Sequence, residues 1–267
     1  MPAFPWPKGE YPQLKYPLAQ FEHENRAEED RCINVIKNII STKRSEGNAV
    51  GAMIIEPISS LGNQMATPYF YKTLRNLAMD EGIPFVVDET KTGMGASGKN
   101  WAHQYWYLQD GKAPDYMTFG GKSGIAGWYS TNEHRYMLAE KSRAFTQNLD
   151  MVKLLNYGTI WQVIEGKGLL HTQKDVSSFL KIELERVGRE TGYIFNVRGY
   201  GTHLGFDCQS PQRCDSIQRY LFKAGVHALK CGPNTIGIRP SMELGVKDAA
   251  VFRDALMHYH PNFDDFQ

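Results

Sequence analysis

Three short apolar runs, two of them ending in a carboxylate, constrain the fold more than any other feature of this sequence. The runs cover residues 49–56, 84–88 and 115–119, and the first two end in Glu56 and Asp88. Apolar runs without polar alternation are typical of strands buried on both faces. A helical pattern lies between the first two runs, at residues 68–81. Strand–helix–strand order at this spacing predicts a parallel, doubly wound α/β sheet.

The segment before the first run divides into two parts. Residues 1–20 contain five prolines and several aromatic residues, which predict an extended segment lying on a surface. Residues 21–47 are charged, with apolar residues at helical spacing, and predict an amphipathic helix. The later helix at 68–81 is followed by Gly82, a plausible helix C-cap.

The pattern changes at about residue 148. Two helices are expected first, at residues 148–166 and 172–191. Short strands at residues 193–197, 201–207, 226–229 and 235–239 precede a last helix near 247–258. This order predicts a second, smaller α+β domain, joined to the first through the helix near residues 150–165. The expected domains are therefore residues 1–147 and 148–267.

Composition excludes several classes of partner. The 30 Lys and Arg residues balance 29 Asp and Glu residues, which gives no electrostatic case for nucleic acid or an anionic membrane. No apolar run approaches the roughly 18 residues that span a bilayer, and the first residues do not resemble a signal peptide. The four cysteines form no C-x-x-C pair and are expected to be free, buried thiols in a reducing compartment.

The strand ends are where chemistry is expected. In open α/β sheets, ligands bind outside the carboxyl ends of the strands, where Glu56, Asp88 and the segment after Phe119 lie. A carboxylate at the end of a buried strand is costly unless a cation or hydrogen bonds satisfy it. For Asp88 alone, a structural role as a helix N-cap or a salt-bridged loop residue is the simpler interpretation.

Five ordered motifs extend this interpretation to a family. They are Glu56-Pro57, VVDETKTGMGASGKNWAHQYW from residue 86, DYMTFGGK from residue 115, VRGYGTHLGFD from residue 197 and IGIRPSMEL from residue 236. Together they resemble the class III, pyridoxal-phosphate-dependent aminotransferases, and among them the 4-aminobutyrate (GABA) transaminases. The resemblance begins at the proline-rich N-terminal segment and covers essentially the whole chain.

The resemblance implies a partial fold-type I transferase. Residues 1–147 would form the C-terminal part of the cofactor-binding large domain, with an incomplete parallel or mixed sheet. Residues 148–267 would form the linking helix and a small α+β domain. The N-terminal third of the family fold, which holds the phosphate loop, is expected to be missing, and one side of the sheet is expected to lack a neighbour.

The resemblance also assigns roles to individual residues. Asp88 falls where the family binds the protonated ring nitrogen of pyridoxal phosphate. Glu56 and Arg239 fall where GABA transaminases place a carboxylate and an arginine that pair or separate as the substrate changes. We therefore expect an ion pair between them, although each side chain alone fits a structural ion pair. Thr146 falls where a threonine contacts the phosphate held by a neighbouring subunit, or it is a helix N-cap.

Two positions depart from the family pattern. In the family, five residues separate the strand aspartate from the lysine that forms the Schiff base. Counted from Asp115, that position is Gly121, and Lys122 follows one residue late. In a regular strand this shift turns the side chain to the opposite face, although the surrounding glycines permit another direction. Lys91 stands where the family has a glutamine on the phenolic oxygen of the cofactor. We expect the isolated chain to form little stable Schiff base.

The predicted function is a 4-aminobutyrate:2-oxoglutarate transaminase, with an amino acid and a 2-oxo acid as substrates and pyridoxal phosphate as cofactor. The chain is expected to be incomplete alone. It would act in a homodimer or larger assembly, or beside an N-terminal companion chain. The alternatives are a degenerate pseudoenzyme kept as a structural subunit, and one half of a split transaminase. A mitochondrial location is expected from the resemblance alone, and no metal site is expected.

Overall fold

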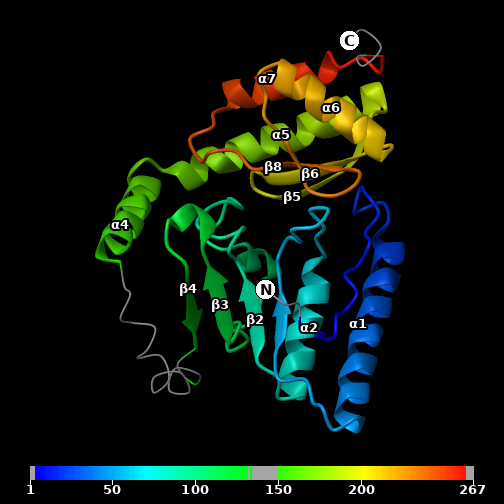
Figure 1. The fold of residues 1–267 in the computed structure, drawn as a ribbon, viewed down its shortest axis with the longest axis vertical. Coiled ribbons are helices and arrows are strands. Elements are labelled where there is room, and N and C mark those ends of the chain that lie inside the picture. The colour runs from blue at the N-terminus through cyan, green and yellow to red at the C-terminus, as the bar shows by residue number, and fades with distance from the viewer. Residues whose placement is uncertain (1–3, 132, 134–149, 263–267) are drawn as a thin grey trace.

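The computed structural model describes residues 4–131, 133 and 150–262, and these residues form two layers, each with its own sheet (Figure 1). The lower sheet has the strand order β1-β2-β3-β4. Its strands are β1 (Met53–Ile55), β2 (Phe85–Asp88), β3 (Tyr116–Phe119) and β4 (Gly127–Ser130). The first three strands are parallel, and β4 runs antiparallel to β3. The sheet is therefore mixed rather than wholly parallel.

Two long helices cover the lower sheet. They are α1 (Glu22–Ser45) and α2 (Pro68–Asp80), and both match the ranges predicted from helical spacing to within a few residues. The fully buried ring of Trp106, at the end of the short 3-10 helix η1 (Ala102–Trp106), stacks on Tyr71 of α2 with ring centroids 4.1 Å apart. Trp106 also meets Phe85 of β2 edge-on. Aromatic packing thus fixes α2 against the first residues of β2.

A buried ion pair joins α2 to the start of β3. Both guanidinium NH2 groups of Arg75 bond the carboxylate of Asp115, at 2.7 and 2.9 Å, and the side chains are 6% and 12% exposed. Asp115 also accepts from the backbone N–H of Phe85 at 2.8 Å, and Arg75 Nε donates to the carbonyl of Lys112 at 3.2 Å. Such fork-on-carboxylate geometry satisfies both charges away from water.

The proline-rich N-terminal segment is extended, as its composition predicts, and lies against the helices. The side-chain amide of Asn25 on α1 makes two hydrogen bonds with the backbone of Lys15. Its Oδ1 accepts from the Lys15 N–H at 2.7 Å, and its Nδ2 donates to the Lys15 carbonyl at 2.9 Å. The Tyr11 hydroxyl bonds that of Tyr71 on α2. The segment therefore forms part of the lower layer.

The upper sheet is antiparallel throughout, with the strand order β5-β6-β8-β7. Its strands are β5 (Ile194–Tyr200), β6 (His203–Cys208), β7 (Leu229–Lys230) and β8 (Thr235–Ile238). Three helices cover its outer face, and its other face is turned toward the lower layer (Figure 1). These helices are α5 (Leu169–Thr191), α6 (Pro211–Lys223) and α7 (Val246–Met257). The second α+β unit that the sequence predicts is present.

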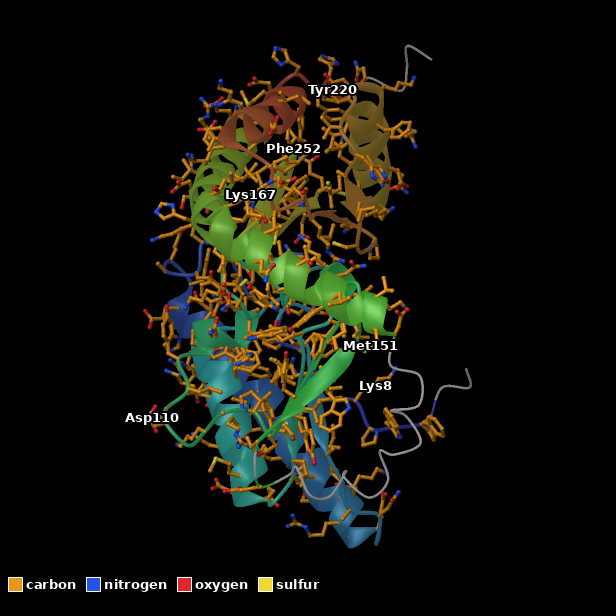
Figure 2. The ribbon with its side chains drawn as sticks, turned by 90° about the vertical axis from the view of Figure 1, so that its left-hand side faces the viewer. Lys8, Asp110, Met151, Lys167, Tyr220 and Phe252 are labelled. Atoms are coloured by element: carbon orange, nitrogen blue, oxygen red, sulfur yellow. The ribbon has the colours of Figure 1, made fainter. Side chains whose placement is uncertain are left out.

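Helix α4 (Met151–Gly166) connects the two layers. Figure 2 shows Met151, in its first turn, near the lower layer and Lys167, just past its end, in the upper one. The hydroxyl of Tyr157 on α4 lies 2.9 Å from that of Tyr129 on β4, and Trp161 of α4 meets Trp101 edge-on. A helix is therefore present near residues 150–165, where the spacing predicts one. No helix in the described part of the chain is long and apolar enough to cross a bilayer.

The sequence prediction was wrong for three elements. It missed α6, although Ser210 caps that helix by accepting from the N–H of Arg213 at 3.1 Å and Pro211 stands at its first position. It missed β4, a four-residue strand, GWYS, that is exposed along much of its length. It placed β7 at residues 226–229, whereas the strand is Leu229–Lys230. The short strands β4 and β7 carry too few apolar positions to define a period. Helix α6 does carry buried Cys214, Ile217 and Leu221 at helical spacing, and the prediction missed this pattern.

Buried contacts between the layers hold the two sheets together. Arg198 of β5 donates to the backbone carbonyls of Gly62 and Asn63 in the lower layer, the second at 3.2 Å from Nε. Its guanidinium, 6% exposed, also pairs with Asp207 of β6 at 2.7 Å. Gly201 has φ of +56°, and a Cβ there would lie 2.2 Å from the carbonyl carbon of Ser97. The interface therefore depends on a buried arginine and on a glycine that permits close backbone approach.

Candidate active site between the two sheets

Asp88 is the last residue of β2, at the carboxyl end of that strand. Its Oδ1 accepts from the backbone N–H of Thr90 at 2.9 Å and from the hydroxyl of Thr118 at 3.0 Å. Thr118 is its register partner on β3, so the parallel pairing of the two strands places this hydroxyl. Within the described residues, Oδ2 accepts no hydrogen bond, which leaves one carboxylate oxygen available to a cationic or N–H-bearing ligand.

The position that carries lysine in the family register is closed to any side chain. Gly121 has φ of +63°, and a Cβ built on it would lie 2.8 Å from the carbonyl oxygen of Thr90. A non-glycine residue would therefore combine a left-handed backbone with a clash against fixed main chain. This backbone requires the glycine that the sequence shows, and the lysine comes one residue later.

Lys122 points toward the upper layer. Strand β3 ends at Phe119, and Gly121–Ser123 form the 3-10 turn η2, so the alternation expected of a strand does not apply to residue 122. Its Nζ donates to the carbonyl of Pro240 at 3.0 Å, which brings the amine across to the end of β8. Burial of the amine lowers the pKa of Lys122 although part of the side chain is exposed. The left-handed backbone at Gly121 and Gly124 thus lets the Lys122 side chain point toward the upper layer.

Arg239 is next to that carbonyl, directly after β8, and its Nε is buried without a hydrogen-bond partner. Within the described residues, no carboxylate oxygen lies within 4.0 Å of its guanidinium. A buried guanidinium donor left unpaired is costly, so this group is suited to an anionic ligand that would complete its bonding.

His203 of β6 is a buried histidine whose pKa is affected by three positively charged side chains. The side chain is 2% exposed, and its Nε2 lies 3.1 Å from Oδ1 of Asn63. Burial, together with the positive charges of Arg239, Lys122 and Lys91, lowers the pKa of His203 to about 3. Three cations from both layers therefore disfavour protonation of this one buried imidazole.

Glu56 does not pair with Arg239, and that expectation was wrong. Its Oε2 accepts from the backbone N–H of Ser60 at 2.8 Å, and its Oε1 accepts from the Ser60 hydroxyl. The Nζ of Lys91 donates to the same hydroxyl and lies 3.9 Å from Oε1. The ion-pair partner of Glu56 is therefore Lys91, which competes for the carboxylate from within the same layer.

Lys122 thus reaches Pro240, next to Arg239, and Lys91 lies 3.9 Å from Glu56, whereas Asp88 contacts Thr90 and Thr118. The sixth expected residue, Thr146, lies outside the described residues. Sequence reasoning missed Ser60, Thr118 and His203. Threonine and serine at strand ends, and one histidine among buried apolar residues, are too common to single out from sequence.

The described residues fit part of a pyridoxal phosphate site. Asp88 offers a free carboxylate oxygen to a protonated ring nitrogen, and the amine of Lys122 has the lowered pKa that favours nucleophilic attack on a carbonyl. The unpaired Nε of Arg239 fits a substrate carboxylate. Asp88 and Lys122 belong to the lower layer, and Arg239 belongs to the upper one.

Comparison with known proteins decides the family. A family model described as aminotransferase class III matches residues 2–258. The chain belongs to the class III aminotransferases. Members of this family use pyridoxal phosphate, and membership implies the same cofactor here.

Curated relatives of this chain include several 4-aminobutyrate aminotransferases. The 4-aminobutyrate aminotransferase of Dictyostelium discoideum is 37% identical over 91% of this chain and 48% of its own length. The human mitochondrial 4-aminobutyrate aminotransferase is 34% identical over 98% of this chain and 51% of its own length. This class III chain therefore spans about half the length of the curated relatives it matches.

Solved structures confirm the partial fold-type I architecture. A lysine aminotransferase from M. tuberculosis superposes with a TM-score of 0.84, covering 98% of this chain and 60% of that one at 21% identity. An S-selective transaminase from Arthrobacter gives a TM-score of 0.73 at 20% identity. Both likenesses concern the fold of this class III chain.

Proposed function

We propose that this class III aminotransferase chain carries the ring-nitrogen and carboxylate-binding half of a 4-aminobutyrate:2-oxo acid transaminase site. The observation that carries the proposal is the convergence of Lys122 and Arg239 from opposite layers at Pro240. The curated relatives from Dictyostelium discoideum and human are named 4-aminobutyrate aminotransferases, which supports the proposal. Bound pyridoxal phosphate would supply an electron sink for the substrate carbanion.

Each residue of the proposed site has a separate role. Asp88, oriented by Thr90 and Thr118, holds a proton on the ring nitrogen through its free Oδ2. Lys122, whose amine has a lowered pKa, moves a proton at the reacting carbon. Arg239 binds the α-carboxylate of the 2-oxo acid and orients it. Neutral His203 adds no charge beside these groups at physiological pH.

The rest of the site is proposed to come from another part of the assembly. Strand β1 forms one edge of the lower sheet, and the exposed side chain of Ile54 lies on it. A companion chain, or a homodimer in which Thr146 reaches a neighbour's phosphate, would complete the cofactor pocket. The human, pig and mouse relatives are named as mitochondrial, which supports a mitochondrial location.

Borohydride reduction tests the proposal. The protein in its native assembly is incubated with pyridoxal phosphate, reduced and digested, and the modified lysine is located by mass spectrometry. The proposal expects stoichiometric modification at Lys122 and none in Lys122→Ala, with Lys181→Ala, an exposed lysine of α5, as the matched control. The same treatment of the isolated chain is expected to label Lys122 weakly.

A structural pseudoenzyme is the second candidate, and Gly121 favours it. The backbone there excludes a lysine at the family position, and Lys122 is already engaged by Pro240. In that case the native assembly would contain no pyridoxal phosphate, and reduction would label Lys122 no more than Lys181. Labelling at Lys91 instead would show that the amine function has moved to the former glutamine position.

A further inference from the structure

The turn that carries Lys122 is fixed by two glycines. Gly121 and Gly124 have φ of +63° and +68°, and the N–H of Gly124 donates to the carbonyl of Gly121 at 3.1 Å, which closes the turn η2. Gly121 also packs closely on the main chain of Thr90, because a Cβ there would lie 2.8 Å from the Thr90 carbonyl oxygen. The backbone on both sides of Lys122 therefore requires glycine, and the side chain leaves the turn from a defined position.

The same packing connects the turn of Lys122 to Asp88. The N–H of Thr90 donates to Oδ1 of Asp88 at 2.9 Å, and Thr90 is the residue on which Gly121 packs. The Lys122 turn and the Asp88 carboxylate are therefore both in contact with one residue of the loop after β2.

In the upper layer, Lys122 contacts the segment that carries Arg239. Strand β8 ends at Ile238, in register with Leu204 of β6, and Arg239 is the first residue beyond it. The Nζ of Lys122 donates to the carbonyl of the next residue, Pro240, at 3.0 Å. Proline has a fixed φ and restricts the preceding residue to extended backbone, so a contact that holds Pro240 also limits the backbone of Arg239.

We propose that Lys122 is a positioning residue for Arg239, and that its amine, bonded to the Pro240 carbonyl, sets the position of the guanidinium relative to Asp88. The inference rests on the proposed function, in which Arg239 binds a carboxylate and Asp88 binds the ring nitrogen. It adds a second role for Lys122, and this role needs no covalent bond to the cofactor. The register shift that moves the amine from residue 121 to residue 122 thus gives it an acceptor in the other layer.

The position of Arg239 matters because its side chain is incompletely bonded. Its Nε is buried and has no hydrogen-bond partner among the described residues. A guanidinium binds a carboxylate through parallel N–H···O bonds of fixed geometry, so a small displacement of its backbone weakens binding. The contacts of Arg198 with Gly62 and Asn63 hold the two layers together as a whole, whereas Lys122 acts on the few residues after β8.

Hydrogen exchange in the segment 239–241, followed by mass spectrometry of the native assembly, tests the proposal. Arg239 and Ser241 carry the two exchangeable backbone N–H groups on either side of Pro240. Lys122→Met removes the donor and is expected to raise the exchange rate of this segment about fivefold. Lys122→Arg keeps a cationic donor and is expected to stay within about twofold of the wild type.

Loss of a positive charge is the alternative explanation, and a second lysine controls for it. The charge of Lys91 acts on His203, as that of Lys122 does, but Lys91 donates to Ser60 and not to Pro240. Lys91→Met is therefore expected to leave the exchange rate of the segment 239–241 within about twofold of the wild type.

Titration with glutarate, a dicarboxylate without an amine, shows whether the position of Arg239 affects binding. Calorimetry is expected to give about fivefold weaker binding for Lys122→Met than for the wild type, and nearly wild-type binding for Lys122→Arg. The difference should persist in about 0.5 M salt, because direct attraction by the charge of Lys122 is screened there and a change in position is not.

Three outcomes would overturn the proposal. They are unchanged exchange in Lys122→Met, an equal rise of exchange in Lys91→Met, and a difference in glutarate affinity that disappears in salt. Borohydride labelling is measured on the same samples. Labelling of Lys122 with unchanged exchange in Lys122→Met removes this inference and leaves the proposed function. Faster exchange and weaker glutarate binding without labelling keep the positioning role and refute the cofactor-binding part of the proposed function. A wild type that binds no glutarate overturns both.

Discussion

The buried imidazole of His203 makes the stability of this protein sensitive to mild acid. Its folded pKa is about 3, against an ordinary value of 6.5, because burial and three neighbouring cations oppose protonation. Between pH 6.5 and 3 the unfolded chain therefore binds a proton that the folded chain does not. The stability that this group contributes is fully present above pH 6.5 and is lost as the pH falls toward 3.

The size of the effect follows from the two pKa values. Lowering the pH from 7 to 5 protonates the unfolded imidazole almost completely while the folded one stays neutral. Linkage then gives a loss of about 2 kcal/mol in the free energy of unfolding from this residue alone. The carboxyl pKa shift resolved on Glu28, which falls to about 2, acts at lower pH and adds little in this window.

Urea unfolding at pH 7, 6 and 5 measures this loss. The variant His203→Gln keeps an amide that can bond Asn63 and cannot titrate, so its stability should fall by about 2 kcal/mol less than that of the wild type. His171→Gln, at an exposed position of α5, is the matched control and should keep the wild-type dependence. Equal losses in the wild type and His203→Gln between pH 7 and 5 would refute the reasoning.

Three further substitutions probe the fold. Arg75→Met leaves the Asp115 carboxylate buried without its cation and should cost about 3–5 kcal/mol in denaturant unfolding; a loss below about 1 kcal/mol would contradict the burial of this pair. Gly201→Ala drives a Cβ into Ser97 at a positive φ and should lower stability by more than about 2 kcal/mol, with a clear fall in melting temperature. Asp150→Ala removes the N-cap of α4, which accepts from two backbone N–H groups, and should cost about 1 kcal/mol. Unchanged melting of either of the last two variants would count against the contacts described.

The sequence predicts the fold best where apolar spacing is long and regular. Helix α1 and the strands ending at Asp88 and Phe119 lie within a few residues of their predicted positions, because the helix has a clear apolar period and the strands are continuous apolar runs. The exposed strand β4 was missed for the opposite reason, whereas α6 was missed although its apolar residues recur at helical spacing. Their positions depend on the neighbours they pair or pack with.

The site is predictable in its residue types and not in its pairings. The carboxyl ends of the parallel strands bring Glu56 and Asp88 to one edge, as the topology requires. The partner of Glu56 depends on Ser60 and Lys91, whose contact no spacing rule predicts over 31 residues. The direction of Lys122 depends on the left-handed backbone of Gly121, which sequence reasoning left open.

The ties between the layers have a kinetic consequence. Arg198 donates to two main-chain carbonyls of the lower layer, and Gly201 touches Ser97 with no side chain between them. Rotation of one layer against the other would break a buried guanidinium contact, so the gap between the sheets keeps a nearly constant width. A small anion should therefore be captured in a single concentration-dependent step, at a rate set by diffusion and ionic strength rather than by a slow opening motion.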